Sequence, residues 1–185
     1  FIQGEKVMVS PSSTSGGIVR GLGRYDYIWR TTESDIAQAE LMLKALAGEQ
    51  SVSDPKSIGL LTNFGSYGNT FFCWLPYHGT EYGYEHDSIH VDRYCDSTTH
   101  EGCDVVADCL GTPNSIDTKL EALLARDLSM VFGVSDSPNT LSCMVETYQA
   151  YKAANPASKT RLVFSDTGYR DIQDLVGAGL DADGV

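Results

Sequence analysis

The sequence is poor in basic residues and has no long hydrophobic run. Only 13 lysine and arginine side chains stand against 25 aspartate and glutamate side chains, which gives a formal net charge of -12. A protein that neutralises nucleic-acid phosphates needs a surplus of basic residues, so this balance argues against nucleic acid as a partner and disfavours an anionic membrane surface. No run of about 18 apolar residues occurs, so the sequence predicts no transmembrane segment.

The start of the chain lacks the features of a secretion signal. Residues 1–6 begin with Phe1 instead of methionine and contain neither a basic region nor an apolar region. We therefore expect a chain from which any signal peptide is absent, either a processed product or a fragment. The 185 residues are 42% hydrophobic and 10% aromatic, which predicts a folded protein with an apolar core in one domain or two small ones.

From residue 57 onward, short apolar runs alternate with amphipathic segments. The apolar runs predict strands at 57–62, 88–93, 128–134 and 161–165. Between them the pattern predicts a helix over 69–75 that Pro76 ends, a helix with Ser115 as its N-cap, and a helix from Pro138 to Asn155. Strands that alternate with helical crossovers favour an α/β fold with an open parallel sheet and helices on both faces.

A different unit precedes this region. Residues 6–10 predict a strand, residues 27–30 an extended segment, and residues 36–47 an amphipathic helix that Gly48 stops. A lone strand cannot bury itself. The strand at 6–10 is therefore expected to belong to a second sheet, most of which this chain lacks.

Three of the five cysteines lie between residues 95 and 109, in a polar stretch over 94–115 that predicts a loop. Cysteines concentrated in a loop are typical of disulfides in an oxidising compartment. We expect Cys95 to pair with Cys103 or Cys109, and the sequence leaves both pairings open. The alternative is a set of free thiols in a cytosolic protein.

Polar residues stand where the predicted strands end, at 10–14, 63–67, 135–137 and 165–168. Ligands of open parallel sheets bind at these carboxyl ends. Hydroxyl groups and helix N-termini suit a carboxylate, and the acids Asp136 and Asp166 suit an ammonium group. The set favours a site for a zwitterionic small molecule, although the same residue types also serve as turn and cap residues.

Enzyme signatures are weak. The nucleophile-elbow, phosphate-loop and dinucleotide-binding glycine motifs are all absent from the sequence. Four histidines within residues 78–100, close to the cysteines, raise a zinc hypothesis. No Cys-x-x-Cys pair accompanies them, and His86 and His90 would lie ~13 Å apart on an extended strand, too far for one zinc ion. No enzymatic activity, metal or cofactor is expected, and a zinc-dependent enzyme is the least favoured alternative.

Four short segments carry a family resemblance: Val9–Ser15, Tyr27–Asp35, Ser66–Gly68 and Phe164–Asp166. In this order and spacing the chain resembles the type I periplasmic substrate-binding proteins of ABC transporters, specifically the branched-chain amino-acid (leucine/isoleucine/valine) binding group. Such proteins close two lobes on a ligand. The resemblance implies that residues 1–26 end the first lobe, 27–35 form an interlobe crossover, and 36–185 form a three-layer second lobe containing the Cys-rich loop (94–115). Because the family is far longer than 185 residues, a fragment is expected.

The resemblance also implies site residues. The segment around Ser12 and Thr14 matches the part of the first lobe that holds an amino acid's carboxylate and ammonium groups. Tyr67 matches an aromatic that closes over the ligand. Asp136 and Thr167 replace a second aromatic and an ammonium-binding glutamate, so the ligand's identity stays open. The expected ligand-binding residues are Ser12, Ser13, Thr14, Tyr67, Asp136, Asp166 and Thr167.

The function that the resemblance implies is solute binding for an ABC transporter. The resemblance implies a small polar ligand, an amino acid of the branched-chain type, with a membrane permease as the partner and a periplasmic or extracellular location. A ligand-sensing receptor domain of the same fold is the alternative.

Overall fold

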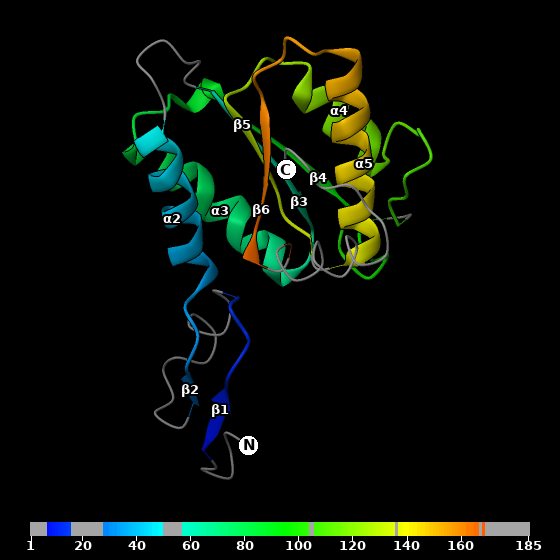
Figure 1. Ribbon diagram of the computed structural model, residues 1–185. Coiled ribbons are helices and arrows are strands. Elements are labelled where there is room, and N and C mark those ends of the chain that lie inside the picture. The colour runs from blue at the N-terminus through cyan, green and yellow to red at the C-terminus, as the bar shows by residue number, and fades with distance from the viewer. Residues whose placement is uncertain are drawn as a thin grey trace.

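The computed structural model shows an α/β domain built on a four-stranded parallel sheet, with a smaller two-stranded sheet beside it (Figure 1). It describes residues 7–15, 28–49, 57–103, 106–135, 137–166 and 168. The strands of the larger sheet lie in the order β4-β3-β5-β6. Their bounds are β3 (Ile58–Asn63), β4 (Ile89–Tyr94), β5 (Met130–Gly133) and β6 (Arg161–Phe164). The predicted strands and the predicted α/β fold class are confirmed.

The central strands are buried on both faces. All six residues of β3 and all four of β5 are buried. Leu60 of β3 pairs in register with Val91 of β4 on one side and with Phe132 of β5 on the other. A strand covered on both faces needs apolar side chains in both directions, which explains the unbroken apolar runs in the sequence.

Two helices cover each face of this sheet (Figure 1). The pair α2 (Asp35–Glu49) and α3 (Ser66–Glu81) encloses one apolar core, which includes Leu43, Leu60 and Phe132. The pair α4 (Ile116–Leu124) and α5 (Pro138–Ala154) encloses the other, which includes Leu61 and Val131. Adjacent strand residues point to opposite faces, so Leu60 and Leu61 contribute to different cores. The short helix η2 (His86–Ser88) precedes β4.

Helix α3 departs from the prediction. It begins at Ser66 rather than residue 69 and runs through Pro76 to Glu81. A proline inside a helix removes one hydrogen bond and typically ends or kinks the helix. Here the fully buried side chains of Phe71 and Leu75 anchor the helix to the sheet just before the proline, and tertiary packing overrides the local break.

The N-terminal unit is a separate parallel pair. β1 (Met8–Ser10) and β2 (Ile28–Arg30) form the two-stranded sheet, with Val9 opposite Trp29. Both side chains are largely exposed, at 55% and 62%. The expectation that the first strand belongs to a second sheet is confirmed, and its pairing with β2 was not foreseen.

Two disulfides fasten the Cys-rich loop. Cys95 bonds to Cys103, which confirms one of the two expected pairings. Cys109 bonds to Cys143 on α5, a pairing that the sequence did not predict. Cys73 is an exposed free thiol. Within the described ranges, none of the helices is long and apolar enough to cross a membrane.

Candidate functional site

Two of the predicted site residues of the larger sheet, Tyr67 and Asp166, meet at the carboxyl ends of β3 and β6. Tyr67 lies in the first turn of α3, directly after β3, and Asp166 follows β6. The Tyr67 hydroxyl donates a hydrogen bond to Asp166 Oδ1 at 2.8 Å. The Tyr67 ring is half-buried and packs edge-on against Phe71 with 5.3 Å between centroids. This places a phenol and a carboxylate together although 99 positions separate them in the sequence.

The loop after β1 contacts this same edge of the larger sheet. The Ser15 hydroxyl donates to the carbonyl oxygen of Ser66 at 3.4 Å, one residue before Tyr67. Arg30 Nη1 donates to the carbonyl oxygens of Thr14 and Ser15, at 3.0 and 3.2 Å. The arginine of β2 therefore holds the loop after β1 in place from the side.

Ser12 and Ser13 are exposed on this loop, whereas Thr14 is half-buried. The backbone N–H of Ser13 donates to the Ser10 hydroxyl at 3.2 Å, which closes the loop into a turn. Among the described residues, the structure shows no hydrogen bond from the Ser12 or Ser13 side chain to another predicted site residue. Thr14 is thus the member of the three that the fold brings against the larger domain.

Asp35 is a further candidate site residue, which the sequence patterns did not select. It opens α2, and its backbone N–H donates to the Thr14 carbonyl oxygen at 3.0 Å. Its side chain is 0% exposed, and neither carboxylate oxygen makes a hydrogen bond of normal geometry with a described residue. Among the segments that carried the family resemblance, Asp35 ends the one over 27–35. An acid in the first turn of a helix otherwise indicates only a favourable helix-dipole contact.

The surroundings of Asp35 raise the pKa of its carboxyl group from 3.8 to about 6. Burial is the main cause, and the nearby negative charge of Asp166 adds to it. The Thr14 side chain and the positive charge of Arg30 act in the opposite direction, but more weakly than burial. The carboxylate is therefore short of positive charge, and a ligand cation beside it would relieve this.

Two predicted residues, Asp136 and Thr167, lie outside the residues that the structure describes. Their neighbours show local order at the same edge. The Ser135 hydroxyl donates to the Ser137 carbonyl oxygen at 2.9 Å, and the Gly168 N–H donates to the Ser165 carbonyl oxygen at 2.9 Å.

Three of the four histidines that raised the zinc hypothesis, His78, His86 and His100, each lie beside a different carboxylate. His78 Nδ1 lies 2.8 Å from Glu81, and His100 Nε2 lies 3.1 Å from Asp96. Four of the five cysteines are oxidised in disulfides. In the part of the chain that is described, no group of three or more histidine, cysteine or acidic side chains is arranged to hold a metal ion.

Comparison with known proteins identifies the fold. No protein-family model and no curated protein matches the sequence. Among solved structures, the chain is similar to the solute-binding protein of an ABC transporter from Rhodopseudomonas palustris BisB5, solved in complex with 3,4-dihydroxybenzoic acid. The TM-score is 0.63 at 11% sequence identity, and the match covers 91% of this chain and 39% of that protein. The larger domain thus has the fold of one lobe of a periplasmic binding protein, and the chain spans well under half of that protein's length.

Proposed function

We propose that this chain is part of a solute-binding protein that delivers a small molecule to the permease of an ABC transporter, in the periplasm or outside the cell. The fold of a binding-protein lobe supports this, as do the two disulfides, which are typical of oxidising compartments. The ligand would lie between the loop after β1 and the carboxyl edge of the larger sheet. In this arrangement residues 1–26 belong to the first lobe, 27–35 to the crossover and 36–185 to the second lobe.

The observation that carries the proposal is the convergence of Thr14, Asp35, Tyr67 and Asp166 from four separate elements. A buried carboxylate with a raised pKa, a second carboxylate and an aromatic ring together suit a ligand ammonium group. The hydroxyl-bearing loop at Ser12, Ser13 and Thr14 suits the ligand's carboxylate. An amino acid has both groups, so we propose an amino acid or a closely related carboxylate as the ligand.

Substitution of Tyr67 tests the proposal. Thermal unfolding of the full-length protein, which supplies both lobes, would be followed with and without L-leucine, L-glutamate and 3,4-dihydroxybenzoate, because a ligand at 100 times its Kd stabilises a protein by about 2.7 kcal/mol. At least one of these probes should raise the Tm, and Tyr67→Ala should reduce that rise. Tyr77→Ala is the matched control, since Tyr77 lies on the same helix and is 54% exposed.

Equal losses in the two tyrosine variants, or no response to any of the probes, would contradict the proposal. A response to 3,4-dihydroxybenzoate alone would keep the site and overturn the amino-acid assignment. If the gene continues into a transmembrane helix and a signalling domain, the same site would serve a receptor and the transport role would be wrong.

A further inference from the structure

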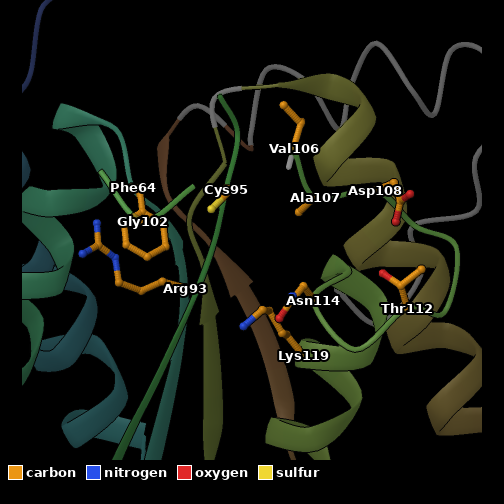
Figure 2. Close-up of a pocket in the computed structure, with 10 residues that line it drawn as sticks. All are labelled: Phe64, Arg93, Cys95, Gly102, Val106, Ala107, Asp108, Thr112, Asn114 and Lys119. Atoms are coloured by element: carbon orange, nitrogen blue, oxygen red, sulfur yellow. The ribbon is translucent and has the colours of Figure 1, made fainter. Parts of the chain in front are cut away.

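A cavity of about 350 Å³ lies between the Cys-rich loop, the end of β4 and the start of α4 (Figure 2). Phe64 and Arg93 line it from the side of β3 and β4, and Asn114 and Lys119 line it from α4 and the residues before it. Val106 and Ala107 of the Cys-rich loop form a further wall. The volume falls within the range of small-molecule sites.

This cavity lies apart from the Asp166 side of the Tyr67 site, although its lining residue Phe64 stands three positions before Tyr67. β4 and β6 occupy opposite edges of the sheet, separated by three strand spacings, or ~14 Å. Asp166 follows β6, whereas Arg93 belongs to β4. The cavity shares no lining residue with Thr14, Asp35, Tyr67 or Asp166.

The walls are fastened to the rest of the fold. The Ala107 N–H donates to the Cys95 carbonyl oxygen at 2.7 Å, and the Ile116 N–H donates to the Asp108 carbonyl oxygen at 2.9 Å. The two disulfides tie the same loop to the end of β4 and to α5. A cavity with such walls is pre-formed, which lowers the entropy cost of binding.

The polar lining is predominantly cationic in a strongly acidic protein. Lys119 Nζ lies 2.7 Å from Asp92 Oδ1, its side chain is only 18% exposed, and an ammonium group has two further N–H donors. Arg93 Nε is buried without a hydrogen-bond partner among the described residues. The guanidinium group of Arg93 lies 3.9 Å from the centroid of the Phe64 ring. Asp108 is the single acid in the lining.

We propose that this cavity binds a small carboxylate with a compact apolar body. Lys119 and the Asn114 amide would donate to the carboxylate. Arg93, whose Nη2 donates to the Asn63 carbonyl oxygen and to Asn69 Oδ1, adds a positive charge in the wall of the cavity. Phe64, Val106 and Ala107 would cover the apolar part. This site is independent of the ligand proposed for the Tyr67 site.

Benzoate and its neutral analogue benzamide test the proposal in titrations of the 15N-labelled chain followed by NMR. Benzoate should give saturable shifts of the backbone amides over residues 93–119, and benzamide should bind at least ten times more weakly. Lys119→Gln should weaken benzoate binding about tenfold, whereas Lys119→Arg should retain it because the charge is kept. Lys44→Gln, which removes an exposed lysine of α2, should have no effect.

Tyr67→Ala separates this site from the other. The shifts over 93–119 should persist in that variant, and their disappearance would mean that benzoate acts through the Tyr67 site. Equal binding of benzoate and benzamide, or no saturable shift near Lys119, would also overturn the proposal. Amide dispersion in the free variants reports whether each one is folded, and a folded Lys119→Gln variant with unchanged affinity would likewise contradict it.

Discussion

Replacing Asp35 with asparagine should change how the stability of the protein depends on pH. In the folded state the pKa of Asp35 is about 6, against 3.8 for an ordinary aspartate. A folded-state pKa above the unfolded value means that the folded state binds the proton more tightly. The contribution of Asp35 to stability is therefore fully present below pH 3.8 and is lost as the pH rises through about 6.

The size of the effect follows from the two pKa values. Linkage gives a stabilisation by protonation of about 1 kcal/mol at pH 5 and about 2 kcal/mol at pH 4, against almost none at pH 7.5. Asp35→Asn removes this dependence. The difference in unfolding free energy between wild type and Asp35→Asn should therefore shift by about 2 kcal/mol between pH 7.5 and pH 4, in favour of the wild type at the lower pH.

Denaturant unfolding of both proteins at several pH values measures the difference. Taking the difference cancels the titration of the other carboxyl groups, which the two proteins share. Glu40→Gln is the control, because Glu40 is an exposed acid on the same helix, and its difference should stay flat. If the difference in unfolding free energy between wild type and Asp35→Asn also stays constant with pH, burial does not raise the pKa of Asp35 and the reasoning is wrong.

Three further outcomes are expected. A ligand ammonium group beside Asp35 should lower the pKa of its carboxyl group, so binding near pH 6 should release a proton. Calorimetry in buffers of different ionisation enthalpy measures this release. If no proton is released, the ligand does not bind beside Asp35. Removing the Cys109–Cys143 disulfide by a double serine substitution should lower the unfolding free energy by roughly 2–4 kcal/mol, measured by denaturant unfolding against intact protein. Gly133→Ala should lower the unfolding free energy by roughly 1–3 kcal/mol, because its Cβ would lie 2.7 Å from the Phe164 ring. Gly48→Ala, whose Cβ would have no atom within 4 Å, should stabilise α2. Equal effects of the two substitutions in thermal melts would contradict the packing at β5.

The larger sheet could be predicted because the apolar pattern of its strands reflects their burial on both faces. The runs at 58–61 and Met130–Gly133 are apolar in both directions, and a parallel sheet covered on both faces requires this. Helix α4 could also be predicted from the sequence. Its Ser115 N-cap position and its buried face of Ile116, Leu120 and Leu124 follow from helical periodicity.

Other features depend on contacts between distant residues, which no local pattern contains. The continuation of α3 through Pro76 depends on Phe71 and Leu75 packing against the sheet. Cys143 is spaced like a core residue of α5, and only the folded path of the Cys-rich loop brings Cys109 to it.

Only part of the candidate site could be predicted, because some of its residues are brought together by contacts between distant segments. The rule that ligands bind at carboxyl ends of parallel strands selects Tyr67 and Asp166, and the structure brings these two within hydrogen-bonding distance. Their role in ligand binding remains a prediction. Asp35 could not be selected in this way because the first turn of a helix is an ordinary place for an acid. The groups that act on its pKa besides burial, Thr14, Arg30 and Asp166, lie on other elements.

The disulfide pattern has a consequence for how the protein matures. The bonded cysteines pair in the order in which they leave the ribosome, Cys95 with Cys103 and then Cys109 with Cys143. An oxidase that joins each cysteine to the next one to emerge would therefore make both native bonds without a later rearrangement, provided that Cys73 is passed over. Cys73 precedes these four cysteines in the sequence and is exposed on α3. A non-native disulfide between Cys73 and Cys95 would leave Cys103 to pair with Cys109, so neither native bond would form.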